Sequence, residues 1–452
     1  MESTQQRDHN ILRTKLERVM ERSKQDRGAE FNNLGHIIDL NLLRQCYRSL
    51  DGSKAVGIDK VTKEEYGKKL NENLKCLLQR IRCGSYHPKA SRIVEIAKAD
   101  GSWRPLAIAC IEDKIVQESV KQILESIYEP LFSNDSHGFR PNRGCNTALV
   151  ALNTSLMKPE CGAVLEIDLK QYFNSIPHQP LEKMLRLKIK DERFLHLILK
   201  ILKAPIEGKD GIIKNNEIGS PQGSIVSPLI ANIYLHYSVD IWFTWINESR
   251  YGGIASLTRY CDDAVFTFGD IADANEFRGD LVIRLGKFGI TLHDGKTKTL
   301  ISGKVNAAKL ARQKLMMPTF TFLGFIHVWG LATQRKTGRK FWRVKRRTCP
   351  MRFRKKLAAV YEFIKSHRHD KNLIPRVKTI VVGYLNYFAI NDNSKRSAQF
   401  LYEVRRMLYK WLNRRSQKMS YDWDHFIAIL EKVRFPNKIK LKNLFFTMSK
   451  AS

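Results

Sequence analysis

The chain has 452 residues, 43% of them hydrophobic, which is too long for one ordinary core and sufficient for two or three compact subdomains. Its 78 lysines and arginines outnumber 45 aspartates and glutamates, and the net charge of +33 indicates a polyanionic partner. The first 30 residues lack the apolar core of a signal peptide, and no stretch approaches the roughly 20 apolar residues of a membrane span, so we expect a cytoplasmic protein without a membrane partner.

The N-terminal part of the chain is predicted to combine helices with one hairpin. Residues 1–50 carry apolar side chains at helical spacing, which predicts one or two amphipathic helices. Residues 92–110 are typical of a β-hairpin turned by Asp100-Gly101. Residues 111–130 show a helical pattern with one apolar face, and residues 181–202 repeat that pattern.

Carboxylates follow apolar strands that lie far apart in the sequence. Residues 164–167 form an apolar strand that ends at Asp168. Further along, apolar runs flank Tyr260-Cys261-Asp262-Asp263, which predicts a β-hairpin whose turn presents two adjacent carboxylates. A helical pattern at 228–245 precedes this hairpin, and we expect that helix to support it.

These carboxylates have two interpretations. Adjacent aspartates in a turn are often no more than a solvated loop. Three carboxylates brought together from distant strands could instead hold two divalent cations about 3.5 to 4 Å apart, which activate a 3′-hydroxyl and neutralise a leaving pyrophosphate. Asp168, Asp262 and Asp263 are therefore candidate metal ligands and catalytic residues.

The C-terminal third holds most of the excess positive charge. Residues 301–452 contain 35 lysines and arginines against 7 acidic residues, a net of +28, which leaves only +5 for the first 300 residues. The basic stretch 334–347 includes two aromatic residues, and residues 351–366 and 394–416 are typical of basic amphipathic helices. A solvated basic face is the ordinary interpretation of such a run. So dense a charge would repel itself unless phosphates neutralise it, which favours nucleic-acid binding.

Further short motifs punctuate the chain. In order they are Gly57-Ile58-Asp59, residues 98–106, His137-Gly138-Phe139-Arg140-Pro141, residues 219–229 with Pro221-Gln222-Gly223, residues 292–298 and Phe322-Leu323-Gly324-Phe325. Together with the two acidic strand ends, these motifs resemble, in the same order, those of a bacterial reverse transcriptase of the group II intron type. The resemblance covers roughly residues 50–415.

The resemblance implies an α+β fold of the right-hand polymerase type, with fingers, palm and α-helical thumb. It divides the chain into a short helical N-terminal extension at 1–50, fingers and palm at 51–325, and a basic α-helical thumb or maturase-like RNA-binding region at 326–452. The implied activity is that of an RNA-directed DNA polymerase, a nucleotidyltransferase that uses two Mg²⁺ ions, with Mn²⁺ as a substitute. The implied partners are an RNA template, deoxynucleoside triphosphates and the complementary DNA product, while protein partners stay open.

Site roles follow from the same resemblance. It implies metal binding by Leu169 beside the three aspartates. The nucleotide-contacting residues would be Lys98, Arg104, Phe173, Gln222, Gly223 and Lys296. The two cations of the 98–106 hairpin would clamp a triphosphate, although two solvated surface cations are the ordinary alternative. The phenylalanine would exclude a 2′-hydroxyl, unless it is simply a core residue, and would disfavour an RNA-dependent RNA polymerase. The lysine is the candidate proton donor to pyrophosphate, with Lys298 as a competitor for that role.

The basic residues are expected to contact the template duplex and a cognate RNA, as basic helices with exposed aromatic residues do. The candidates are Arg140, Arg143, Arg343, Lys345, Arg346, Arg347, Arg405, Arg406, Arg414 and Arg415. Three aromatic side chains of the thumb-like region, Tyr384, Tyr387 and Phe388, are expected mostly to pack its core.

Some features depart from the family pattern and leave the biological role open. Asn174 stands where many relatives have a second Asp, and Cys261 stands where most have Ala. The eight cysteines lack the spacing of zinc knuckles, which indicates reduced thiols and counts against an appended zinc endonuclease domain. The chain therefore resembles defence-associated reverse transcriptases, which copy a noncoding RNA encoded beside them, as well as intron-encoded maturases. The RNA partner would be a structured noncoding RNA or an intron RNA.

Overall fold

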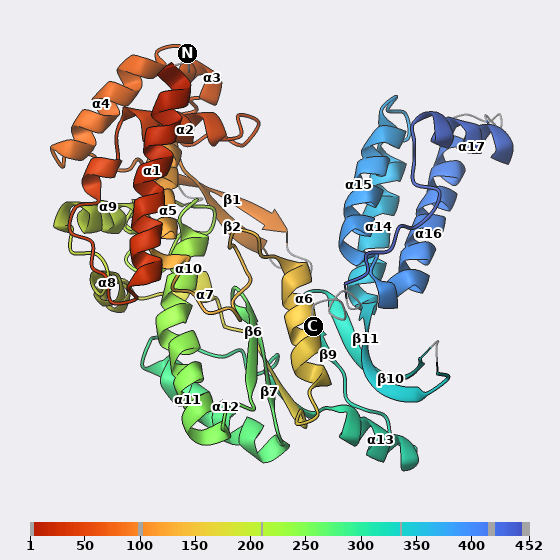
Figure 1. Ribbon diagram of the computed structural model, residues 1–452. Coiled ribbons are helices and arrows are strands. Elements are labelled where there is room, and N and C mark those ends of the chain that lie inside the picture. The colour runs from red at the N-terminus through yellow and green to blue at the C-terminus, as the bar shows by residue number, and fades with distance from the viewer. Residues whose placement is uncertain (1–3, 98–102, 209–210, 335–336, 415–420, 445–452) are drawn as a thin grey trace. The chain divides into compact units, whose positions relative to one another are not determined.

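The computed structural model describes residues 4–97, 103–208, 211–334, 337–414 and 421–444 (Figure 1). The chain forms two compact units. The first unit contains Met1–Ala148, Leu165–Phe266 and Asn275–Lys298, and the second unit contains Leu149–Val164, Thr267–Ala274 and Thr299–Ser452. Helices and β-sheets occur in both, so the predicted α+β class is confirmed.

Helices build the N-terminal part of the first unit. They are α1 (Thr4–Gln25), the 3₁₀ turn η1 (Gly35–Ile37), α2 (Leu40–Ser49), α3 (Lys63–Gly67) and α4 (Leu70–Arg82). The Asp39 side chain caps α2 by accepting a hydrogen bond from the Leu42 N–H at 2.9 Å. Helix α1 packs against α5 (Ile111–Tyr128) (Figure 1). The Ser23 hydroxyl of α1 donates to the Ile127 carbonyl of α5 at 2.5 Å. The helices predicted within residues 1–50 are confirmed.

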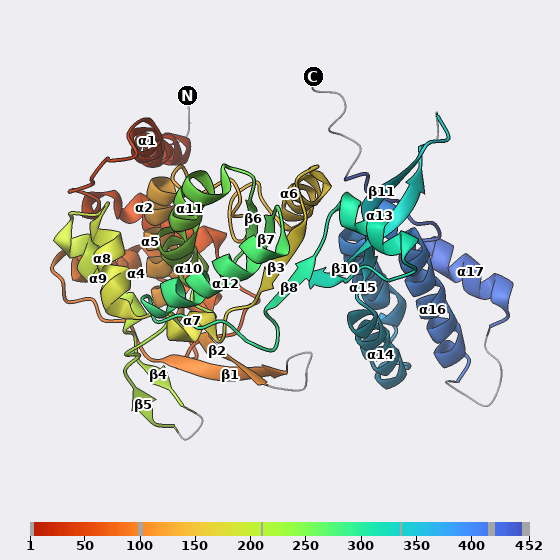
Figure 2. The ribbon, with the colours of Figure 1, turned by 90° about the horizontal axis from the view of Figure 1, so that it is seen from below.

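A small sheet follows these helices. Strands β1 (Ser91–Ala97) and β2 (Trp103–Ile108) pair antiparallel, which confirms the predicted hairpin, while its Asp100-Gly101 turn lies outside the described residues. Strands β4 (Ile206–Glu207) and β5 (Ile213–Lys214) extend the sheet in the order β2-β1-β4-β5 (Figure 2). Helix α5 comes directly after β2 and buries its whole apolar face, as its sequence pattern predicts.

The helical stretch predicted at 181–202 is divided into α8 (His178–Arg186) and α9 (Glu192–Leu202). The break lies at Asp191, whose side chain caps α9 by accepting from the Phe194 N–H at 3.0 Å. The same carboxylate accepts from the backbone N–H groups of Leu34 and Gly35 at 2.7 and 2.8 Å. Asp191 therefore joins α9 to the N-terminal segment, a contact that local periodicity does not reveal.

The sheet that carries the acidic residues has the strand order β6-β7-β3-β8. Its strands are β3 (Ala163–Ile167), β6 (Ser256–Tyr260), β7 (Asp263–Phe268) and β8 (Lys298–Ile301). A nearly continuous helix precedes β6 and consists of α10 (Ser227–Leu235), the π-helical turn η2 (His236–Asp240) and α11 (Ile241–Tyr251). The ring of Phe266 in β7 packs against Phe243 of α11 and Phe277 of α12 (Ile271–Gly286), with ring centroids 5.1 and 4.9 Å apart. These helices support the strands, as predicted for the stretch 228–245.

The second unit combines a three-stranded sheet with a helical bundle. The strands β9 (Phe320–Phe322), β10 (Phe325–Thr333) and β11 (Lys340–Thr348) follow helix α13 (Lys304–Arg312) and pair in the order β11-β10-β9. Helices α14 (Pro350–Ser366), α15 (Leu373–Phe388) and α16 (Ser394–Leu412) lie side by side, and α17 (Trp423–Lys432) adds to their core (Figure 1). Tyr384 is buried in this core and stacks on Phe400, whereas Phe388 is half-buried.

The cysteines are free thiols with unequal exposure. Cys46, Cys110, Cys161, Cys261 and Cys349 are buried, Cys145 is half-buried, and Cys76 and Cys83 are exposed. No helix within the described ranges is both long enough and apolar enough to cross a membrane.

Candidate active site

The sheet order places the three aspartates at one edge. Asp168 directly follows β3, Asp263 is the first residue of β7, and these two strands are neighbours. At the opposite end of the two strands, the Gly162 N–H donates to the Phe268 carbonyl at 2.8 Å, which shows that they run antiparallel. Asp168 therefore lies at the same edge as Asp263 and as Asp262 of the β6-β7 turn.

A returning segment brings a lysine to this edge. The Lys170 N–H donates to the Thr291 carbonyl and the His293 N–H to the Asp168 carbonyl, both at 2.8 Å, so residues 291–293 run beside β3's end. The turn that follows places the Lys296 Nζ 2.9 Å from the Asp168 Oδ2. The two side chains are 59% and 27% exposed, so this ion pair is open to solvent and contributes at most about 1 kcal/mol to stability.

The donor chemistry of this edge suits a hard divalent cation. Carboxylates and backbone carbonyls are the oxygen ligands that Mg²⁺ takes in proteins. Across the described ranges, however, no three His, Cys, Asp or Glu side chains are gathered closely enough to hold a metal ion. Asp168 is paired with Lys296 instead. The residue types therefore suit magnesium, but in this structure the three carboxylates are not close enough together to bind one ion.

The turn that carries Asp262 has an unusual backbone. Cys261 has φ +58°, in the left-handed region that side chains other than glycine rarely adopt. Its side chain is buried, and burial raises the pKa of its thiol. A Cβ atom on Gly138 would lie 2.5 Å from the Cys261 nitrogen, so the backbone at 138 passes directly against this turn. Glycine is needed there because any side chain would displace the turn.

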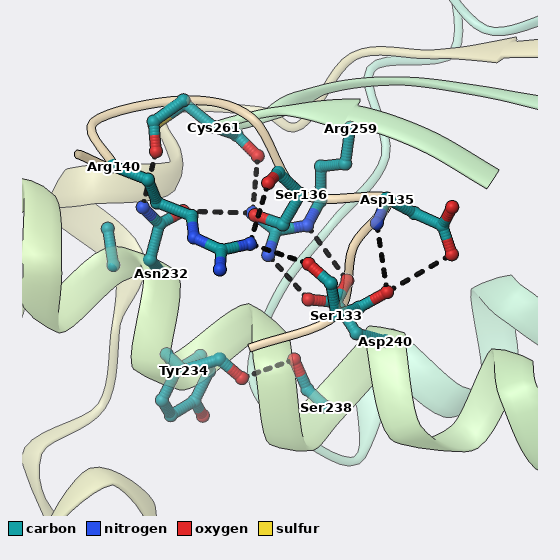
Figure 3. A network of polar contacts seen from close by, with 12 residues as sticks. Ser133, Asp135, Ser136, Arg140, Asn232, Tyr234, Ser238, Asp240, Arg259 and Cys261 are labelled. Carbon is teal, nitrogen blue, oxygen red and sulfur yellow. Dashed lines mark hydrogen bonds and ion pairs between the residues drawn. The ribbon is translucent and has the colours of Figure 1, made fainter. Parts of the chain in front are cut away.

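Beneath the turn lies a buried cation that sequence reasoning missed (Figure 3). The Arg259 Nε and Nη2 donate to the two carboxylate oxygens of Asp240 at 2.8 and 2.5 Å. The Arg259 Nη1 donates to the Cys261 carbonyl and to the Asn232 Oδ1, both at 3.0 Å. Burial alone would lower the pKa of the Arg259 guanidinium, but the neighbouring Asp240 carboxylate outweighs it and the pKa is raised. The arginine is therefore charged and fully engaged.

Arg140 supports the loop beside this cation. Its Nε and Nη2 donate to the Glu129 carboxylate. Its Nη1 donates to the carbonyls of Ser133 and Ser136 at 2.6 and 2.8 Å (Figure 3). The same loop pairs with β6, because the Arg259 N–H donates to the Asp135 carbonyl at 2.8 Å. Arg140 is buried, and its charge stabilises the loop, while its expected nucleic-acid contact stays a prediction.

Arg143 also serves this loop, since its guanidinium donates to the Asn134 carbonyl and to the Asn134 side chain, both at 2.6 Å. Arg143 is half-buried, and its proposed nucleic-acid contact stays a prediction.

Two candidate nucleotide-contacting segments are held next to each other. Phe173 lies half-buried in α7 (Tyr172–Ser175), and its carbonyl accepts from the Ser220 N–H at 2.7 Å. A Cβ atom on Gly219 would lie 2.7 Å from the Asn174 carbonyl oxygen, so the two segments are in close contact. The loop that carries Gln222 therefore begins beside Phe173.

The Gln222-Gly223 loop is also fixed from its other side. The Ala107 N–H of β2 donates to the Gln222 carbonyl at 2.6 Å, and the Ile225 N–H donates to the Gln117 side chain of α5 at 3.0 Å. Gly223 has φ +109°, and a Cβ atom there would lie 2.5 Å from the Ala107 carbonyl. Lys98 and the side chain of Arg104 lie outside the described part of the chain.

The residues of the second unit that are expected to contact nucleic acid differ in how exposed their side chains are. Arg346 donates to Asp392 at 2.6 Å with both side chains fully buried, and Arg343 pairs with the other oxygen of that carboxylate. The expected nucleic-acid contact of Arg346 stays a prediction, but its side chain lies in the core of this unit. The sequence indicates this burial through the alternation of β11, because residue 346 shares a face with the buried Val344 and Thr348.

The remaining candidates of the second unit lie at or near its surface. Lys345 is half-buried and donates to the Leu331 carbonyl at 2.7 Å. Arg347, Arg406 and Arg414 are exposed, and Arg405 is half-buried. Arg415 lies outside the described residues.

Comparisons with known proteins identify the matched region. A family model described as "Reverse transcriptase (RNA-dependent DNA polymerase)" matches residues 96–327. The chain is 37% identical over 231 residues to the group II intron-encoded protein LtrA of Lactococcus lactis subsp. cremoris, which covers 49% of this chain and 37% of that protein. It is 45% identical over 160 residues to an uncharacterized 91 kDa protein in the cob intron of Schizosaccharomyces pombe, covering 35% of this chain and 20% of that protein.

A third relative is the Escherichia coli protein YkfC, 35% identical over 193 residues that cover 42% of this chain and 50% of that protein. The aligned parts thus span between a fifth and half of the length of these relatives.

Proposed function

Because this chain belongs to the reverse transcriptase family and has its α+β right-hand polymerase fold, we propose that it is an RNA-directed DNA polymerase that extends a 3′-hydroxyl with deoxynucleotides. The observation that carries the proposal is the sheet order β6-β7-β3, which brings Asp168, Asp262 and Asp263 to one edge. All three lie inside the matched region 96–327. A partner RNA would supply the template.

We assign the three aspartates, together with the backbone carbonyl of Leu169, as the ligands of two Mg²⁺ ions, with Mn²⁺ as a substitute. Such ions, when bound, polarise the attacking hydroxyl and stabilise the departing pyrophosphate. Lys296 would leave its ion pair with Asp168 and give a proton to the pyrophosphate, because its ammonium already lies at this edge.

The nucleotide would contact the neighbouring segments. The Phe173 ring would lie beneath the sugar and exclude a 2′-hydroxyl, while the Gln222-Gly223 loop would contact the base pair or the template. The hydrogen bonds of both segments to their surroundings support this assignment, since a steric gate works only if it cannot move aside. Lys98 and Arg104 would bind the triphosphate.

A second candidate function is that of a maturase, which stabilises a folded intron RNA for splicing. Its support is that similar proteins are named as intron proteins, the LtrA protein and the cob intron protein among them. Polymerisation would then be secondary. For the polymerase, the template would be either an intron RNA or a structured noncoding RNA in antiphage defence.

The first experiment sequences the RNA and complementary DNA that co-purify with the chain. It compares the wild type with an Asp262→Ala, Asp263→Ala variant. A matched control, Glu64→Ala with Glu72→Ala, also removes two negative charges but from exposed helix positions. We expect one RNA to be enriched with all three proteins and complementary DNA to vanish only in the aspartate variant.

Two results would change the assignment. Undiminished complementary DNA in the aspartate variant would remove these residues from catalysis. Enrichment of an RNA without complementary DNA from any protein, the wild type included, would favour the maturase.

A further inference from the structure

The catalytic hairpin is held by a side chain that points back beneath its own turn. Arg259 lies at the end of β6, three residues before Asp262, and its guanidinium reaches the carbonyl of Cys261 (Figure 3). That carbonyl belongs to the one residue of the turn with a left-handed backbone. A left-handed Cys is unfavourable by itself and persists only when its surroundings fix it.

The contacts of Arg259 leave it no freedom to turn. Its Nε and Nη2 edge forms a two-point pair with Asp240, and both side chains are at most 2% exposed. The two Nη1 hydrogens are directed at Asn232 and at the Cys261 carbonyl. A lysine could not replace this pattern, because its ammonium is a point charge without a planar fork.

The helix that packs beneath the hairpin carries both side chains that accept from Arg259. Asn232 lies in α10 and Asp240 ends the π-helical turn η2. A π-turn adds one residue to the helical repeat and is often found at functional sites. Here it allows both polar side chains of one nearly continuous helix to reach the same guanidinium. The Asn232 amide also donates to the Gly138 carbonyl at 2.7 Å, and Gly138 packs against Cys261.

We infer that Arg259 is a positioning residue, which together with Asp240 and Asn232 fixes the Cys261 carbonyl and thereby the direction in which Asp262 and Asp263 leave the turn. The inference rests on the proposed polymerase function, since direction matters only if these aspartates bind the metal ions. Arg259 itself is buried beneath the turn and acts through the backbone.

A merely structural ion pair would behave differently. Its loss would lower the stability of the protein, but the molecules that remain folded would bind metal and nucleotide normally. Replacement of both charges by apolar residues separates the two roles, because a buried ion pair exchanged for well-packed apolar side chains often costs no stability. The Cys261 carbonyl would nevertheless lose its donor.

The test uses the full chain with Arg259→Lys, Asp240→Asn and the double variant Arg259→Met, Asp240→Leu. Asn232→Ala is a milder variant that leaves the ion pair intact in case the others do not fold. The control is Asp113→Asn, since Asp113 is equally buried, accepts from the Tyr86 hydroxyl at 2.6 Å and is not hydrogen-bonded to the hairpin. Circular dichroism selects a temperature at which each protein is folded.

Two quantities are then measured on the folded proteins. The first is Mn²⁺ affinity in the absence of nucleotide, from the electron paramagnetic resonance signal of the free ion. The second is primer extension, resolved into kcat and the KM for deoxynucleotide. We expect the Arg259 and Asp240 variants to lose about 10- to 100-fold in Mn²⁺ affinity and kcat, as when groups supporting metal ligands are removed, with KM within about twofold. Asn232→Ala should shift both in the same direction by less, and Asp113→Asn should leave both within about twofold of the wild type.

Folded variants with wild-type Mn²⁺ affinity and kcat would overturn the inference. The double variant gives the decisive result when its stability equals that of the wild type, because any loss of Mn²⁺ affinity then cannot come from unfolding. Failure of the proposed function would look different. In that case Asp262→Ala would not weaken Mn²⁺ binding, and the wild type itself would not extend a primer.

Discussion

Individual buried histidines make the fold sensitive to acid. The His327 ring lies in β10, fully buried and stacked on Phe320 at 4.7 Å. Burial, with a further contribution from the Arg346 charge, lowers the pKa of His327 to about 3. Burial likewise lowers the pKa of His137 and of His236 to about 4. These rings stay neutral in the folded protein at pH values where the unfolded chain already takes up protons.

The sign of the effect follows from proton linkage. An unfolded histidine titrates near pH 6.5, so above that pH neither state is charged and these groups leave stability unchanged. As pH falls from about 6.5 towards the lowered pKa values, these histidines bind protons in the unfolded state but not in the folded state. The free energy of unfolding should therefore fall over this range.

His327→Phe should reduce this acid sensitivity. The variant keeps the aromatic stack on Phe320 and removes one titrating group. Between pH 7 and pH 5 the loss of unfolding free energy should be smaller than in the wild type by about 2 kcal/mol. Denaturant titrations at the two pH values measure it, with the exposed His369→Phe as the control. An unchanged pH dependence in His327→Phe would contradict the prediction.

The charged residues of the site differ in how far the sequence predicts their roles. Asp168, Asp262 and Asp263 were identifiable because each adjoins an apolar strand, which is a local pattern. Arg259 and Asp240 were missed, although a charge inside an apolar strand and another inside an apolar helix are rarely buried unless paired. Their pairing depends on how η2 and β6 pack, which the local sequence does not determine.

At the scale of elements, the β6-β7 hairpin, which carries the proposed catalytic aspartates, depends on a loop more than a hundred residues upstream. The loop's glycine at 138 leaves no room for a side chain beside Cys261, and the His137 N–H donates to the Arg259 carbonyl at 2.8 Å. The loop and β6 therefore act as one piece, and a shift in the loop would be passed to the turn.

Gly138→Ala should displace the β6-β7 turn. The new Cβ atom would meet the Cys261 nitrogen at 2.5 Å, which is too short for any real contact, so one backbone must move. We expect primer extension to fall at least about tenfold, which corresponds to about 1.4 kcal/mol of lost transition-state stabilisation. Gly286→Ala is the control, because a Cβ atom at the end of α12 meets nothing within 4 Å. Equal activity of the two variants would show that the turn tolerates the shift.

Elements with a regular apolar pattern were predictable, as α5, the β1-β2 hairpin and helices α14 and α16 of the second unit show. The exceptions have non-local causes. The Asp191 carboxylate binds residues 34 and 35 and so separates α8 from α9. The π-turn η2 interrupts a stretch whose sequence pattern predicts one continuous helix, and its last residue, Asp240, pairs with Arg259.

At the scale of the whole molecule, the charge distribution should govern the binding of the proposed RNA partner. Nearly all of the net charge of +33 belongs to residues 301–452, and several of the arginines there are exposed. Neutralised phosphates release counterions, so affinity should depend steeply on salt. The division into fingers, palm and thumb at residues 50 and 325 stays a prediction, because spacing within the sequence does not determine where compact units end.

RNA affinity should fall by about 10³- to 10⁵-fold between 50 and 200 mM salt, if 6 to 10 phosphates are contacted. Fluorescence anisotropy with the co-purified RNA measures the slope. Arg406→Gln should reduce that slope by about one, whereas Lys75→Gln, an exposed change in the first unit, should leave it unchanged. A slope near zero for the wild type would exclude phosphate-driven binding.

Unequal cysteine exposure has a practical consequence for labelling. Cys76 lies in α4 and Cys83 directly follows it, both exposed, and a hydrogen bond with Ser85 lowers the pKa of Cys83. The lower pKa favours the reactive thiolate, so a maleimide dye should modify Cys83 first. The thiol of Cys261, in the β6-β7 turn, is buried, and the dye can be attached without replacing it. The sequence thus offers a fluorophore site for single-molecule observation of this protein on the RNA proposed as its partner.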